Sequence, residues 1–147
     1  MSVTFLEISH DGGIGERGVG LAAPAREVCR ATAEMYRTTG FTPPWIGYLA
    51  FEGGQAVGTC AFKAAPSDGA VEIAYFTFPG HEGQGIATAM ARQLVAIALG
   101  ADPALRIVAH TLPEPDASNA VLQKLDFVLL GDWEDPVDGT VWEWQLG

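Results

Sequence analysis

The residues best placed to do chemistry form a glycine-rich run, Gly80-His81-Glu82-Gly83-Gln84-Gly85-Ile86-Ala87-Thr88. It lies between an apolar segment and an alanine-rich one, which predicts a turn from a strand into a helix. The N–H groups and the positive dipole end of a helix's first turn bind anions, and glycine lets the backbone approach a phosphate closely. The run therefore predicts a phosphate-binding turn over residues 83–88, although an ordinary strand-to-helix turn would have the same spacing.

Two common phosphate-binding motifs do not fit this run. A P-loop requires a lysine directly after its last glycine, but Ile86 follows Gly85. A dinucleotide fingerprint requires a third glycine, which is Thr88 here, and an acid that ends the next strand, whereas Asp102 precedes that strand. Both motifs are therefore excluded.

One carboxylate, Glu72, stands in an otherwise apolar run, VEIAYF, that predicts a strand. Burial would raise the pKa of this carboxyl toward neutrality and make it a candidate general base. The alternative is a structural carboxylate paired with an arginine or with backbone amides. Glu143, on the last predicted strand, is a second candidate base. The histidines His10, His81 and His110 are dispersed without metal-ligand spacing, so no metal site is expected.

The elements that must hold these groups can be read from periodicity and from turn residues. Strands are expected over residues 4–8, 45–52, 55–63, 71–78, 106–111, 127–130 and 140–146, and helices over residues 24–39, 84–99 and 115–125. A glycine-rich loop is expected over residues 12–20, and Gly53-Gly54 predicts a hairpin turn. The order β-α-β-β-β-α-β-α-β-β predicts an α/β fold with a mixed, mostly antiparallel sheet and helices on both faces.

The composition suits one domain over residues 1–147, because 48% of the residues are hydrophobic and only 18% are charged. No segment has the pattern of a secretory signal or of a membrane span. Cys29 and Cys60 lack a CxxC spacing and are expected to be reduced core thiols. These features predict a cytoplasmic protein without a membrane partner, and they leave the oligomeric state open, a homodimer included.

The net charge is −10, with only eight lysines and arginines. A protein that binds nucleic acid needs clustered cations against the phosphates, so nucleic acid is excluded as a partner. The negative field favours the approach of a cationic ligand such as a protonated amine. An excess of acid that only keeps the protein in solution is the alternative.

A second motif, TLPEPDASNAVLQKLDF, spans residues 111–127. Together with the glycine run and the strand before it, this motif resembles the signatures of the GNAT family of N-acetyltransferases, and in particular the branch that includes the ribosomal-protein-alanine acetyltransferases. The positions that match the two signatures are Gly85, Ala87, Thr111, Pro113, Ser118, Val121, Leu122, Lys124 and Phe127. Three positions depart from the family pattern, namely Glu82, Pro115 and Asp126.

The resemblance implies a GNAT-like fold with acetyl-CoA (coenzyme A) as co-substrate. It implies that backbone amides hold the CoA pyrophosphate along Gly83, Gln84, Gly85, Ile86, Ala87 and Thr88. Backbone N–H groups near Phe76, Thr77 and Phe78 would polarise the thioester where two strands splay apart. Ser118 would protonate the departing thiolate, the alternative being a helix N-terminal serine bonded to backbone.

The activity that the resemblance implies is direct transfer of an acetyl group to a primary amine, on a small molecule or at a protein N-terminus. The amine must lose a proton to Glu72, to Glu143 or to a water molecule. The rival interpretation is a non-catalytic acyl-CoA-binding or regulatory module on the same fold, which the three departures favour.

Overall fold

The helices and strands follow one another in the order expected from the sequence. The computed structural model of the chain describes residues 2–14, 22–114 and 116–147. Its elements are β1 Thr4–Glu7, α1 Ala25–Thr39, β2 Gly47–Glu52, β3 Gln55–Phe62, β4 Ala70–Thr77, α2 Ile86–Ala101, β5 Arg106–Thr111, α3 Ala117–Lys124, β6 Phe127–Asp135 and β7 Gly139–Leu146. Much of the expected glycine-rich loop lies outside the described residues, as does Pro115.

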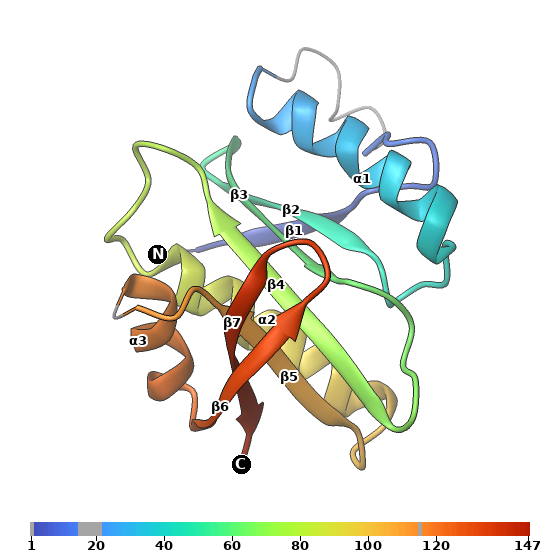
Figure 1. Ribbon diagram of the computed structural model, residues 1–147. Coiled ribbons are helices and arrows are strands. Elements are labelled where there is room, and N and C mark those ends of the chain that lie inside the picture. The colour runs from blue at the N-terminus through green and yellow to red at the C-terminus, as the bar shows by residue number, and fades with distance from the viewer. Residues whose placement is uncertain (1, 15–21, 115) are drawn as a thin grey trace.

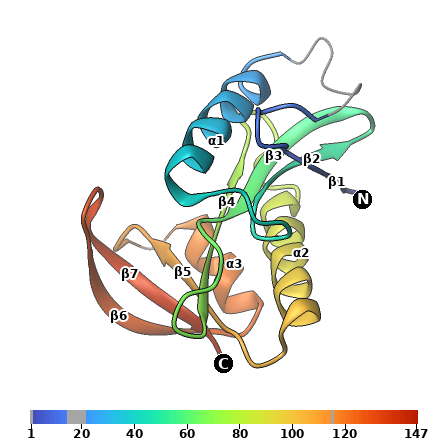
Figure 2. The same ribbon diagram turned by 90° about the vertical axis from the view of Figure 1, so that its right-hand side faces the viewer.

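The described strands form one seven-stranded sheet in the order β1-β2-β3-β4-β5-β7-β6. Neighbouring strands are antiparallel except β4 and β5, which run parallel. Helix α1 lies on one side of the sheet, toward which the β6–β7 hairpin also bends, and α2 and α3 lie on the other (Figures 1 and 2). The predicted mixed sheet with helices on both faces is therefore confirmed.

Glycines and strand pairing decide where the elements begin and end. Gly53 and Gly54 have φ angles of 59° and 80° and form the expected β2–β3 turn. Helix α2 begins at Ile86, later than expected, because Gly85 before it has a left-handed backbone with φ 79°. Strand β6 continues to Asp135, beyond the expected end, because its acidic second half pairs with β7. That half has no apolar alternation, so periodicity did not reveal it as a strand, and its pairing with β7 defines it.

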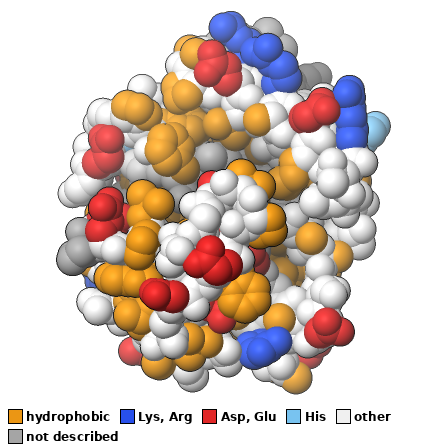
Figure 3. Space-filling view, in the orientation of Figure 1, with side chains coloured by type: hydrophobic (Ala, Val, Ile, Leu, Met, Phe, Trp, Pro, Cys, Tyr) orange, Lys and Arg blue, Asp and Glu red, His pale blue; other side chains and the backbone are white. Residues whose placement is uncertain are grey.

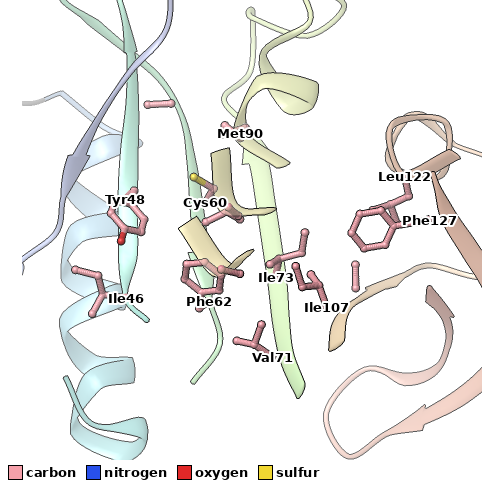
Figure 4. Packing of buried hydrophobic residues seen from close by; sticks show 14 of the residues in the cluster. Ile46, Tyr48, Cys60, Phe62, Val71, Ile73, Met90, Ile107, Leu122 and Phe127 are labelled. Atoms are coloured by element: carbon pink, nitrogen blue, oxygen red, sulfur yellow. The ribbon is translucent and has the colours of Figure 1, made fainter. Parts of the chain in front are cut away.

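The core holds α2 close against β3 and β4. Met90 and Leu94 of α2 are fully buried and belong to the same cluster as Ile73 of β4 (Figure 4). A Cβ atom at Gly58 of β3 would lie 2.9 Å from Met90 Cε and 2.9 Å from the carbonyl oxygen of Phe76. Glycine at this position therefore permits the close approach of the helix and fixes the place of the turn that precedes it.

The sheet opens between its two parallel strands. Pairing of β4 with β5 runs from Ala70 opposite Arg106 to Ile73 opposite Ala109. Beyond that point β4 stays paired with β3 as far as Thr77, while β5 stays paired with β7. The two strands thus diverge, as the resemblance implied, and they leave a gap in the middle of the sheet.

Candidate active site

Backbone N–H groups of β4 face the gap. The amide of Phe78 donates to Val57 at 2.9 Å, and the Glu72 carbonyl accepts from Lys63 at 3.0 Å, so the even positions bond toward β3. The Gly69 carbonyl accepts from the first residue of β5 at 2.9 Å, so the odd positions face β5. Because backbone groups alternate along a strand, the amides of Tyr75 and Thr77 point into the gap where β5 has moved away.

This alternation distinguishes the three positions selected from the sequence, two at the end of β4 and Phe78 directly after it. Thr77 presents its amide to the gap, as a group that polarises a thioester must. The amide of Phe78 is already hydrogen-bonded to β3, and its side chain is buried in the core. Phe76 directs its backbone toward β3, and its side chain is 54% exposed. The sequence could not assign the orientation of the amides in this stretch, because that orientation depends on which neighbour each backbone group pairs with.

The glycine-rich turn has the backbone that an anion site requires. Gly83 has φ 75°, and Gly85, with φ 79°, is the N-cap of α2. No described side chain caps this helix end, and its first turn contains no acidic residue. A Cβ atom at Gly83 would meet no described atom within 4 Å, so the space in front of the turn is open. The first amides of α2 are thus free to bind a phosphate.

Glu82, the acid in the family's Arg or Gln position, has its own role in the turn. Its Oε1 accepts a hydrogen bond from the amide of Gly80 at 2.8 Å. Hydrogen bonds from its own amide and from that of Gly80 hold the pKa of this exposed carboxyl below its usual range. The departure at this position therefore stabilises the turn.

A cavity of about 330 Å³, here called the turn cavity, lies between the glycine turn, β4 and α3. It collects most of the residues that the sequence selected as cofactor-binding, together with the candidate acid. Those in its lining are Phe76, Thr77, Gly83, Gly85, Ile86, Ala87, Thr88 and Ser118. The selected residues outside this lining are Gln84 and Phe78.

Ser118 lies in the first turn of α3 and is half-buried. Asp116 is the N-cap of this helix and accepts from the Asn119 amide at 3.1 Å, so the serine is not needed as the cap. The Ser118 carbonyl accepts a hydrogen bond from the Tyr75 hydroxyl at 3.1 Å. Burial raises the pKa of Tyr75, which therefore stays protonated and acts as a donor. This tyrosine is a site residue that sequence reasoning missed.

Glu72 belongs to a charged cluster made of Lys63, Glu72, His110 and Glu143. Its Oε2 lies 3.0 Å from Lys63 Nζ and 3.1 Å from His110 Nδ1. His110 Nε2 lies 3.1 Å from Glu143 Oε2, and the imidazole stacks on Trp133 with ring centroids 5.7 Å apart. The contact between Glu72 Oε2 and His110 Nδ1 is close, but it lacks the angle of a hydrogen bond.

The cluster corrects two expectations. Glu72 is not isolated among apolar groups, because its side chain points away from its buried neighbours Val71 and Ile73 and remains 23% exposed. The spacing of the histidines predicts no role for His110 as a metal ligand. The structure nevertheless places His110 between the two candidate carboxylates, across three neighbouring strands. The period-two alternation of the strand could have shown that Glu72 points to the opposite face from Val71 and Ile73.

A second cavity of about 240 Å³, the gap cavity, lies where β4 and β5 diverge. Ala74, Tyr75, His110 and Ser118 are part of its lining. Tyr75 and Ser118 also line the turn cavity, so the two spaces adjoin. The gap cavity therefore lies between the turn cavity and His110 of the charged cluster.

None of the described helices is both long and apolar enough to cross a membrane. Over residues 2–14, 22–114 and 116–147, no three His, Cys, Asp or Glu side chains gather as metal ligands do. Both cysteines are buried and unpaired.

A free helix start, an adjacent cavity and strand amides that face a gap together suit a phosphate-bearing group-transfer substrate. A family model described as an acetyltransferase (GNAT) domain matches residues 19–128. The chain therefore belongs to the GNAT acetyltransferase family, as the motifs indicated, and its co-substrate is acetyl-CoA.

Solved structures with the same fold include three acetyltransferases of different description. RimL, a ribosomal-protein alpha-N-acetyltransferase in complex with coenzyme A, is 22% identical over 82% of this chain and 70% of its own, with a TM-score of 0.63. An IAA acetyltransferase from Bacillus cereus is 17% identical over 99% of both chains, with a TM-score of 0.69. A spermidine N-acetyltransferase chimera from Vibrio cholerae and hSSAT is 12% identical over 99% of this chain and 95% of its own, with a TM-score of 0.70. A comparison with curated proteins gave no match.

Proposed function

We propose that this protein is an N-acetyltransferase that moves an acetyl group from acetyl-CoA directly to a primary amine. The observation that carries the proposal is the gap in the sheet, whose cavity shares Tyr75 and Ser118 with the turn cavity and is also lined by His110 of the charged cluster. Transfer forms a C–N bond and breaks a C–S bond, so the amine must lose a proton and the leaving thiolate must gain one. Candidate proton acceptors for the amine and a candidate proton donor for the thiolate lie around the gap.

The residues that would hold acetyl-CoA offer backbone amides to its phosphates and to its thioester. The amides of residues 83–88 would bind the pyrophosphate at the start of α2, and the amide of Thr77 or Tyr75 would donate to the thioester carbonyl. Gln84 would contribute its backbone amide alone. The co-substrate supplies the activated acetyl group, and the protein supplies orientation and the handling of protons.

Glu72 is the proposed proton acceptor, with Glu143 or a bound water as the alternative. An alkylamine has a pKa near ~10 and arrives largely protonated, so a carboxylate has to receive its proton. His110 lies between the two carboxylates, hydrogen-bonded to Glu143 and in close contact with Glu72. Ser118 is the proposed donor to the thiolate, since it lies between the turn cavity and the gap cavity.

The family departures are compatible with an active enzyme. Glu82 is engaged within the turn, and Asp126 adopts the left-handed backbone expected where the family has glycine, with φ 69°. The charged cluster beside the gap favours catalysis over the non-catalytic acyl-CoA-binding alternative, which gives no reason for it. We also propose a cytoplasmic location, which the unpaired cysteines support.

The test is a thiol-release assay with acetyl-CoA and a panel of primary amines, with each acetylated product identified by mass spectrometry. Saturable thiol release that depends on one class of amine, with product of one added acetyl group, supports the proposal. Tight binding of acetyl-CoA without transfer to any amine, N-terminal peptides included, would instead identify a binding module.

A further inference from the structure

A third cavity, here called the apolar cavity, lies between α1 and the sheet and has a volume of about 270 Å³. Its walls come from α1, β3 and β4, and they include Val28, Ala31, Met35, Ala61, Ala74 and Phe76. None of the described side chains that line it is charged. Cys60 contributes a thiol whose pKa is raised to about 12 by burial, so that this wall is also uncharged.

The apolar cavity meets the reaction point. Ala74 and Tyr75 line both the apolar cavity and the gap cavity, and Phe76 lines both the apolar cavity and the turn cavity. All three spaces therefore converge on three successive residues of β4. Whatever occupies the apolar cavity lies beside the place where the amine would be acetylated.

Phe76 indicates that this surface is used. Its ring is 54% exposed although it lies on a central strand, where large apolar side chains are ordinarily covered. Hydrophobic side chains also gather on this face of the molecule between α1 and the β6–β7 hairpin, around a hollow (Figure 3). An aromatic ring left open beside an uncharged cavity suits an apolar ligand group.

Charge and apolar surface are separated along one face of β4. Glu72, Ala74 and Phe76 alternate onto the same face, so the charged cluster lies on one side of Ala74 and the apolar cavity on the other. An amine at Ala74 thus has carboxylates on one side and an uncharged wall on the other. A second cationic group on the acceptor would have to lie against the uncharged side chains of the apolar cavity.

We propose that the acceptor is a primary amine with one positive charge whose body is an aliphatic or aromatic group seated in the apolar cavity. This inference rests on the proposed function and deepens it by naming the substrate class. The same chemistry is offered by a free arylalkyl- or alkylamine and by a peptide whose first residue is large and apolar.

The first experiment compares kcat/KM for amines that differ in the body of the molecule. We expect 2-phenylethylamine and 3-methylbutylamine to exceed ethanolamine and 1,4-diaminobutane by at least about tenfold, because each methylene in an apolar pocket is worth on the order of tenfold or more. Peptides beginning with phenylalanine or serine form the second arm and show whether the source is a free amine or a peptide. Equal or better rates with the polar and doubly charged amines would overturn the inference and leave the acetyltransferase proposal intact.

The second experiment uses two variants of α1 that add the same charge. Ala31 and Thr38 are both exposed on α1, but only Ala31 is part of the lining of the apolar cavity. Ala31→Glu should raise KM for 2-phenylethylamine at least about tenfold and leave KM for acetyl-CoA unchanged, because a carboxylate in an apolar space repels an apolar ligand. Thr38→Glu should behave as the parent protein, and equal effects of the two variants would refute the inference.

Failure of the proposed function gives a different pattern. If no amine is acetylated, calorimetry of 2-phenylethylamine with the protein and CoA tests the inference alone. Binding that Ala31→Glu abolishes and Thr38→Glu retains would support the apolar cavity as a ligand site. Absence of amine binding to the parent protein would overturn it.

Discussion

Replacing Glu72 by glutamine tests the proposed mechanism most directly. Glutamine keeps the shape of the side chain but cannot accept the proton of the amine. If Glu72 is the base, turnover at neutral pH should fall by roughly 10² to 10⁴, the usual worth of a general base. A hundredfold loss corresponds to about 2.7 kcal/mol in the activation free energy.

A loss of folding stability in Glu72→Gln is too small to explain a fall in turnover of this size. The ion pair of Glu72 with Lys63 is partly exposed, with 23% and 45% of the two side chains open to solvent. Such pairs contribute about 1 kcal/mol or less to the free energy of unfolding. The melting temperature should therefore fall by only a few degrees, since 1 kcal/mol is worth roughly 2–4 °C in a protein of about this size.

Glu143→Gln is the matched control, because the two carboxylates lie at the same 3.1 Å distance from opposite nitrogens of His110. They are also similarly exposed, at 23% and 21%. A structural role in holding the imidazole would make the two variants alike. A proton acceptor at Glu72 makes its variant the slower one by at least tenfold.

The assay is the pH dependence of kcat for the parent and both variants, with melting temperature measured in parallel. The deficit of Glu72→Gln should shrink as the pH rises toward ~10, because more of the amine then arrives without its proton. Near-normal turnover of this variant across the whole pH range would refute the assignment. A larger loss in Glu143→Gln would transfer the role to Glu143.

Three further predictions follow from the turn, from α3 and from the core. Gly85→Glu should weaken CoA binding at least about tenfold in calorimetry by placing a side chain and a like charge before the first amides of α2. Gly100→Glu adds the same charge at the far end of α2 and should leave the affinity unchanged. Ser118→Ala should lower kcat more than the affinity for acetyl-CoA, because a charge on the thiolate develops only during transfer, and equal losses would identify a binding residue. Gly58→Ala should destabilise the protein by about 1–3 kcal/mol, since its Cβ would lie 2.9 Å from Met90 Cε. Chemical denaturation measures that change, and an unaltered midpoint would contradict the described packing of α2.

The amino-acid sequence determined the features that depend on neighbours along the chain. Gly53-Gly54 specified a hairpin because two consecutive residues with positive φ match the twist of antiparallel strands. Gly83 and Gly85 specified the turn before α2 for a similar reason, since few other residues adopt a positive φ at low cost. The order of the elements and the mixed sheet followed from such local signals, and the motifs around them identified the family.

Only the tertiary structure decided which distant residues share the site. His110 meets Glu72 and Glu143 because β4, β5 and β7 are neighbours in the sheet. In this order β7 lies between β5 and β6, although β6 precedes it in the chain. The Thr77 amide lacks a partner on β5 because β5 leaves β4 before that residue, and the apolar cavity depends on how far α1 lies from β3. Strand alternation fixes which face a side chain occupies, but contact across the sheet depends on strand order, register and divergence, which arise from the packing of the whole chain.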